Sequence, residues 1–149
     1  MMYYIAHRGL LDGPNEKWEN APWIIDEAIL YCGHAEVDLW VVDNIFYLGH
    51  DVAKYKVDWQ WLFDRRDNLF IHCKNIAALC VMSNYRDFYH YFWHQQDTLT
   101  LTSRGMIWAF PGKQTIRGSI AVLPERHNDD ISQCIGICTD FVRRYKENK

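Results

Sequence analysis

Several features that would indicate other classes of protein are missing from this chain of 149 residues. No apolar run approaches the roughly 20 residues that are needed to span a bilayer, so we expect no membrane span. Lysine and arginine number 16 against 19 acidic residues, and a chain without a basic excess is not expected to bind nucleic acid. The first residues have no basic region and only a short apolar run. This indicates that there is no signal peptide and predicts a cytoplasmic protein.

Cysteine usage excludes a disulfide framework. The five cysteines are odd in number and form no Cys-x-x-Cys pair, so reduced thiols are expected. Internal repeats, low-complexity stretches and interdomain linkers are also missing. The length therefore predicts a single domain over residues 1–149 with one real core. What the chain does have is 49% hydrophobic and 15% aromatic residues, enough to fill such a core.

Short strands alternate with short helices along most of the chain. The patterns predict strands over 3–6, 35–42, 45–48, 69–74, 88–93, 98–102, 106–110, 119–123 and 135–139, and helices over 21–32, 59–63, 76–82 and 141–146. This alternation favours an α/β fold with a mostly parallel sheet. Polar residues at strand ends are typical of a β/α barrel, although such barrels seldom have fewer than about 200 residues. We therefore predict a reduced TIM-like β/α barrel with short or missing helices and one or two β-hairpins.

Four polar segments in the first third of the chain carry the chemistry. They are His-Arg-Gly at 7–9, Glu-Asn at 19–20, Glu-Val-Asp at 36–38 and Gly-His-Asp at 49–51. The two imidazoles, His7 and His50, can act as an acid and a base. Glu36 and Asp38 lie two residues apart on a predicted strand, so both point to one side and can hold a divalent cation. These residue types are those of a metal-assisted enzyme that cleaves phosphodiesters.

The same segments resemble the pattern of the glycerophosphodiester phosphodiesterase family, in order and in approximate spacing. Phe-Ile-His-Cys-Lys at 70–74 resembles the third strand of that family, and Gly-Ile-Cys-Thr-Asp-Phe at 136–141 resembles its final strand. Residues 80–130 do not match the long form of the family, so the resemblance implies a much shortened member.

The resemblance implies a TIM-barrel-like fold related to phosphatidylinositol-specific phospholipase C. It implies a divalent cation, usually Ca or Mg, between Glu36 and Asp38, and it makes His7 and His50 the acid–base pair. Arg8 and Lys74 would hold the substrate phosphate. In such relatives the nucleophile can be a neighbouring hydroxyl of the substrate, which leads through a cyclic phosphate.

One departure from the family pattern concerns the metal. His72 stands where the family has a third acidic ligand, and imidazole is a better ligand for Zn or Mn than for Ca or Mg. Three alternatives stay open: His72 binds a softer metal, Glu19 or Glu125 supplies the third oxygen, or the metal is weakly held. His94 and Trp93 are further candidates for the site, and no role is derived for residues 95–118.

The sequence therefore predicts a metal-dependent phosphodiesterase that cleaves a small glycerophosphodiester-like substrate. A phosphodiester lyase or transferase that stops at a cyclic phosphate is an alternative. A non-catalytic module that binds a phosphorylated ligand or sugar phosphate is another, because the third acidic ligand is missing. The sequence does not specify the oligomeric state.

Overall fold

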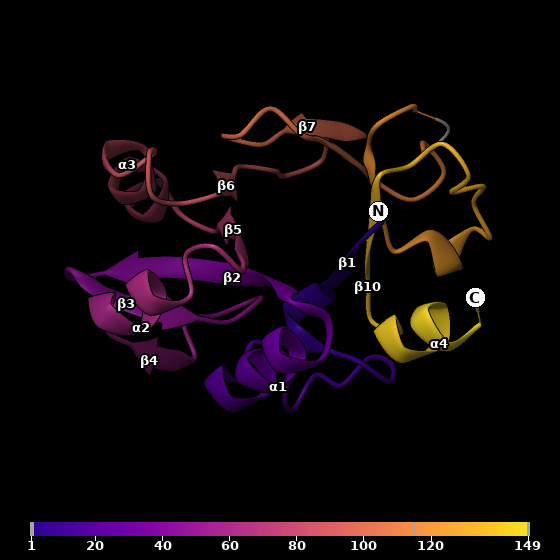
Figure 1. The fold of residues 1–149 in the computed structure, drawn as a ribbon. Coiled ribbons are helices and arrows are strands. Elements are labelled where there is room, and N and C mark those ends of the chain that lie inside the picture. Colours follow the sequence, from indigo (N-terminus) through magenta and orange to yellow (C-terminus); the bar gives the residue numbers. More distant parts are fainter. Residues whose placement is uncertain (1, 115, 149) are drawn as a thin grey trace.

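A single ten-stranded sheet dominates the structure, a computed structural model that describes residues 2–114 and 116–148 (Figure 1). Its strands are β1 (Tyr3–Ala6), β2 (His34–Val42), β3 (Ile45–Leu48), β4 (Tyr55–Val57), β5 (Leu69–Cys73), β6 (Tyr91–Phe92), β7 (Leu99–Leu101), β8 (Ile107–Ala109), β9 (Ile120–Val122) and β10 (Gly136–Thr139). The α-helices are α1 (Pro22–Cys32), α2 (Trp59–Asp64), α3 (Ile76–Asn84) and α4 (Val142–Glu147), and two short 3-10 turns are η1 (His7–Gly9) and η2 (Pro124–Arg126).

Seven strands lie parallel to their neighbours in the order β6, β5, β2, β1, β10, β9 and β8. Helices make only some of the crossovers: α1 links β1 to β2, and α3 links β5 to β6. The sheet curls, and the hairpin of β7 and β8 lies across from β2 on the far side of the curl (Figure 1). The predicted α/β class with a mostly parallel sheet is therefore confirmed, in the form of a curled mixed sheet with few helices.

Both predicted hairpins are present. β2 and β3 pair antiparallel, and their turn residues Asp43 and Asn44 have φ values of 51° and 62°. Positive φ at both central positions is what a tight hairpin turn requires, and Asp and Asn tolerate it better than most residues. β7 and β8 form the second hairpin. β4, which extends the first hairpin to a third strand, was not predicted.

The strand predicted over residues 88–93 is reduced to the two residues of β6. The chain turns just before it, because the N–H groups of Phe88 and Tyr89 both donate to the carbonyl of Tyr85. The edge of β6 that does not pair with β5 contacts the second hairpin through two individual hydrogen bonds and does not form a regular strand pairing with it. The Ser103 N–H donates to the Tyr91 carbonyl at 2.8 Å, and the Tyr91 N–H donates to Ser103 Oγ at 3.0 Å.

Local sequence explains where the helices begin and end. Pro22 occupies the first turn of α1, where its missing N–H costs nothing, and Gly33 ends that helix at φ 90°. The side chain of Asp58 caps α2 by accepting from the Trp61 N–H, and Asn75 caps α3 in the same way. No helix within the described ranges has the length and apolar character to cross a membrane.

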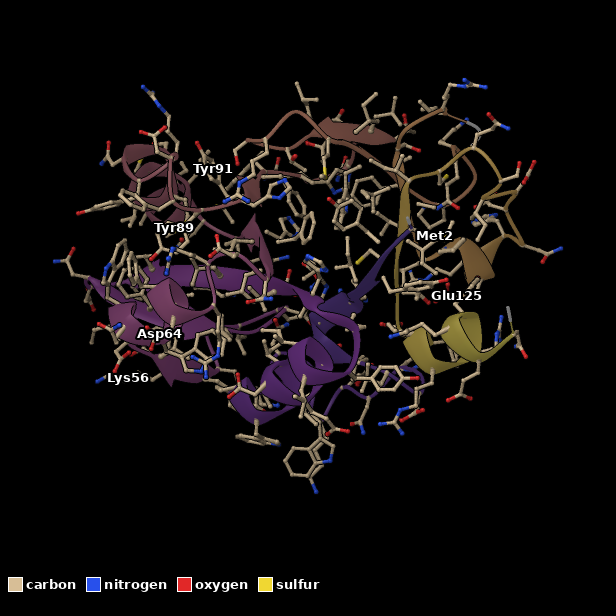
Figure 2. The ribbon with its side chains drawn as sticks, in the orientation of Figure 1. Met2, Lys56, Asp64, Tyr89, Tyr91 and Glu125 are labelled. Atoms are coloured by element: carbon tan, nitrogen blue, oxygen red, sulfur yellow. The ribbon has the colours of Figure 1, made fainter. Side chains whose placement is uncertain are left out.

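Alternation along the strands divides the core into two layers. On β2, Val37 and Leu39 pack into a cluster shared with α1, α2 and α3, on the outer face of the curl. A second cluster fills part of the inside and includes Ile5, Phe70 and Trp108. Figure 2 shows side chains filling the space between the strands. Successive residues of a strand face opposite sides of the sheet. The residues of β2 that alternate with Val37 and Leu39 therefore face the inside of the curl. The five cysteines are all free thiols, as expected.

Candidate functional site

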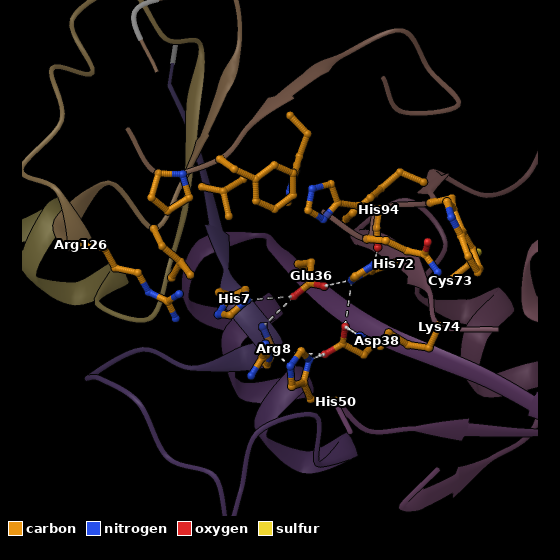
Figure 3. A pocket seen from close by; sticks show the side chains of 18 residues that line it. His7, Arg8, Glu36, Asp38, His50, His72, Cys73, Lys74, His94 and Arg126 are labelled. Carbon is orange, nitrogen blue, oxygen red and sulfur yellow. Dashed lines mark hydrogen bonds and ion pairs between the residues drawn. The ribbon is translucent and has the colours of Figure 1, made fainter. Parts of the chain in front are cut away.

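The inward face of the curled sheet holds a cavity of about 430 Å³ near the carboxyl ends of the parallel strands (Figure 3). Glu36 and Asp38 on β2 and His72 on β5 reach it because they alternate with outer-core residues. The register brings the strands together, since Asp38 pairs directly with His72 across the parallel ladder. Parallel strands thus gather residues that are distant in the sequence at one edge of the sheet.

Glu36 and Asp38 are the most deeply buried charged groups of the cavity, with 3% and 1% of their surfaces exposed. Burial and the neighbouring charge of Asp38 raise the pKa of Glu36. Burial alone would also raise the pKa of Asp38, but the ring nitrogens of His50 and His72 outweigh it and hold this pKa well below its usual range. Two buried carboxylates side by side favour a cation between them or a cation partner for each.

Asn20 fixes the orientation of Asp38. Its Nδ2 donates to Asp38 Oδ2 at 2.9 Å, and its Oδ1 accepts from the Asp38 N–H at 2.9 Å. Asn20 is fully buried and adopts φ 63°, a left-handed conformation that Asn tolerates better than most residues. The loop between η1 and α1 therefore brings this amide against β2.

His72 is held in one tautomer by its surroundings. Its Nε2 lies 2.9 Å from the backbone carbonyl of His94, which can only accept, so Nε2 carries a hydrogen. Its Nδ1 lies 3.0 Å from Asp38 Oδ1 and 4.0 Å from Glu36 Oε1, both of which are also acceptors. A neutral His72 would point a lone pair at a carboxylate. Either a second proton or a metal ion between these atoms removes that repulsion.

The ligand atoms of Glu36, Asp38 and His72 lie within 4.8 Å of one another, close enough to share one metal ion. The bond from His72 to a backbone carbonyl is the arrangement that usually orients a metal-binding imidazole. Phe92 supports the ring from one face, with centroids 5.0 Å apart and planes 10° from parallel. These three residues are therefore the part of the site that fits a divalent cation.

His7 stands on the opposite side of Glu36 from His72. Its Nδ1 donates to Asp140 Oδ1 at 2.7 Å, which leaves Nε2 directed to the cavity, 3.9 Å from Glu36 Oε2. Burial would lower the pKa of His7, but the hydrogen bond to Asp140 and the charge of Glu36 raise it overall. His7 is thus an oriented imidazole that readily holds a proton on the nitrogen facing the cavity.

Arg8 connects the two halves of the site. Its backbone N–H donates to Glu36 Oε2 at 3.1 Å, a contact that the φ of 53° at Arg8 allows. Its guanidinium donates to Glu19 Oε2 at 2.9 Å and to His50 Nε2 at 3.1 Å, and its Nε lies 3.3 Å from Asp38 Oδ2. Because Arg8 only donates, His50 Nε2 accepts, and the proton of a neutral His50 is on Nδ1.

Lys74 extends from the end of β5 into the cavity, and its Nζ lies 3.8 Å from Asp38 Oδ1. This long contact leaves the ammonium freer to meet another anion than the guanidinium of Arg8. His50 is the most exposed member of the group, with 34% of its side chain accessible, and its Nδ1 lies 3.4 Å from Asp38 Oδ2. The predicted phosphate-binding residues, Arg8 and Lys74, and the predicted acid–base pair, His7 and His50, therefore all line one cavity.

The two alternative third acids lie outside the cluster. Glu19 pairs with Arg8 and does not line the cavity. Glu125 accepts a hydrogen bond from Thr139 Oγ1 at 2.9 Å and lies beside α4 (Figure 2). Among the described residues, His72 is therefore the third potential ligand. His94 and Trp93 do line the cavity, and the His94 ring stacks on Phe110.

Two residues that matter to the site, Asn20 and Asp140, were not among the predicted site residues. Both belong to segments that carry the family resemblance, Glu-Asn at 19–20 and Thr-Asp at 139–140. Their residue types gave a signal, because a polar residue beside a buried strand end needs a partner. Their partners, Asp38 and His7, are visible only in three dimensions.

Searches against protein-family models, curated proteins and solved structures find no match to this chain.

Proposed function

We propose that this protein is a metal-dependent phosphodiesterase that cleaves a small glycerophosphodiester-like substrate at the cavity of Glu36, Asp38 and His72. One observation carries the proposal: a candidate cation site lies between two imidazoles, His7 and His50, in a cavity that also receives Lys74. Acid, base, cation site and phosphate-binding charge are the parts that phosphodiester cleavage needs.

His7 is the better candidate for the proton donor. Asp140 keeps the proton on Nδ1, so Nε2 is the nitrogen that exchanges protons with the substrate, and the raised pKa of His7 favours the charged, donating form. An alcohol that leaves a phosphodiester needs a proton on its oxygen, and His7 Nε2 faces the cavity where that oxygen would lie.

His50 is the better candidate for the base. Its Nε2 lone pair accepts from Arg8, and the proton on Nδ1 faces Asp38. When Arg8 turns to a phosphate oxygen, this lone pair becomes available to take a proton from the attacking hydroxyl. Arg8 would then bind phosphate only by giving up its hydrogen bond to His50. Lys74 would lose only its 3.8 Å contact with Asp38.

A divalent cation on Glu36, Asp38 and His72 would offset negative charge on the phosphoryl oxygens. His72 Nδ1 and Asp38 Oδ1 direct lone pairs toward each other, which supports an ion between them. The nitrogen ligand favours Mn or Zn over Ca or Mg.

We further propose that the curled sheet is a reduced TIM-like β/α barrel and that the chain is a shortened member of the glycerophosphodiester phosphodiesterase family. The order of seven parallel strands supports this proposal, as does the gathering of the site at their carboxyl ends. The segments at 7–9, 19–20, 36–38 and 49–51, which carry the resemblance, also come together in space.

The test is a panel of glycerophosphodiesters assayed with Mn, Zn, Mg and Ca in turn. We expect metal-dependent turnover, and we expect His7→Ala and His50→Ala each to lower kcat by roughly 100-fold or more. His127→Ala is the matched control, because His127 is exposed and outside the cavity. Full activity in both site variants would refute the assigned roles.

Phosphorus NMR of the products separates the proposal from its first alternative, since a cyclic phosphate that never opens would identify a lyase or transferase. Calorimetric titration addresses the second alternative. A chain that binds a phosphorylated ligand but turns over no diester with any metal would be a binding module.

A further inference from the structure

The cavity has a second half that the proposed chemistry does not use. Beyond the charged residues its wall is formed by Phe92, Trp108, Phe110, Val122 and Leu123. All but Phe110 are at most 5% exposed and belong to the inner core cluster. This half of the cavity, which we call the apolar wall, is therefore rigid core surface that opens into the site.

The apolar wall begins directly at the candidate metal ligands. Phe92 stacks on His72 and also packs on Trp108, with centroids 4.9 Å apart. Phe110 stacks on the ring of His94, whose backbone carbonyl holds His72. A phosphate held by a cation on Glu36, Asp38 and His72 would therefore lie beside these aromatic rings.

Polar groups that could satisfy a hydroxylated or charged alcohol lie elsewhere. Phe92, Phe110, Val122 and Leu123 have no polar side-chain atom, so hydroxyl groups placed against them would lose hydrogen bonds to water without replacement. The exposed residues Gln95 and Arg126 also line the cavity, so polar contacts are available there. The wall instead offers flat apolar area, which favours a flat or branched hydrocarbon.

We propose that one of the two alcohols of the substrate is an uncharged apolar group, of about the size of a benzyl group, that packs on the apolar wall. This inference rests on the proposed function, because it assumes that the phosphate lies at the charged half. It deepens that function by naming the chemistry of one arm of the diester.

The experiment measures binding rather than turnover, with two phosphate monoesters as probes. Benzyl phosphate and phosphoethanolamine share the phosphate and differ in the alcohol. In the presence of Mn, we expect benzyl phosphate to bind at least tenfold more tightly, measured by calorimetry and by the fluorescence of the tryptophans in the cavity.

Variants locate the preference. Phe110→Asn should weaken benzyl phosphate at least fivefold and change phosphoethanolamine less than twofold. Phe63→Asn is the matched control, because Phe63 is also half-buried but lies on α2, away from the cavity. Pro111→Ser, at a half-buried residue that lines the cavity next to Phe110, gives a second measurement if Phe110→Asn does not fold.

Lys74→Ala should weaken both probes by a similar factor, which reports on the charged half alone. Equal affinities for the two probes, or tighter binding of phosphoethanolamine, would overturn the apolar subsite and leave the proposed function standing. No binding of either probe would overturn both.

Discussion

Asn20 gives the sharpest test of how the site is built, because a single buried side chain positions Asp38. Asn20→Ala removes two hydrogen bonds of 2.9 Å, one to an ionised carboxylate and one to a backbone N–H. The first contributes about 1.5–3 kcal/mol and the second about 1 kcal/mol. Alanine at φ 63° adds strain of about 1 kcal/mol. The sum predicts a loss of about 3.5–5 kcal/mol in the free energy of unfolding.

The assay is equilibrium unfolding in urea, followed by tryptophan fluorescence. Asn44→Ala is the matched control, since Asn44 has φ 62° but is exposed in the turn between β2 and β3. It should cost only the strain, about 1 kcal/mol. The difference between the two variants then measures the buried hydrogen bonds. If Asn20→Ala loses no more stability than Asn44→Ala, the Asn20 amide does not hold Asp38 in place.

Three further predictions concern single side chains. His72→Glu should shift the ratio of Ca to Mn affinity toward Ca by at least tenfold in calorimetry, and an unchanged ratio would mean that His72 is not a ligand. Asp140→Asn should lower the pKa of His7 in an NMR titration without metal, because it removes the carboxylate that raises this pKa; a constant pKa would contradict the role of the hydrogen bond. Burial lowers the pKa of His90 to about 4 in the folded protein, against about 6.5 when unfolded. Only the unfolded chain gains this proton between those values, so stability should fall by about 2–3 kcal/mol as the pH drops from 6.5 to 4. In His90→Gln, which can keep a bond to Thr102 and does not titrate, that part of the pH dependence should vanish.

Sequence patterns were sufficient for elements whose causes are local. The proline and glycine that bound α1, the Asp58 cap of α2 and the Asp-Asn turn after β2 act over a few residues. The elements that they bound, α1, α2, β2 and β3, lie within one residue of the predicted ranges. The strand predicted over 88–93 is shorter in the structure, because contacts outside the local pattern decide its length. Its aromatic residues suit a strand, but a turn that bonds Phe88 and Tyr89 to Tyr85 leaves only Tyr91 and Phe92 to pair.

The chemistry of the site was also readable in part. Alternation alone placed Glu36 and Asp38 on one side of a strand, and a histidine at 72 stood out against the acidic residue that the family pattern has there. Whether Glu19, Glu125 or His72 completes the candidate metal site depends on which segments of the chain lie side by side. The parallel register of β2 and β5 decided it by setting Asp38 opposite His72.

By itself, therefore, the sequence determined which residue types could do chemistry and which short elements carry them, because capping, alternation and turn formation are local. Only the tertiary structure decided the partners: Asn20 with Asp38, Asp140 with His7, and the apolar wall beside His72. Those contacts depend on strand order and on the curl of the sheet, which bring together residues from 18 to 133 positions apart in the sequence.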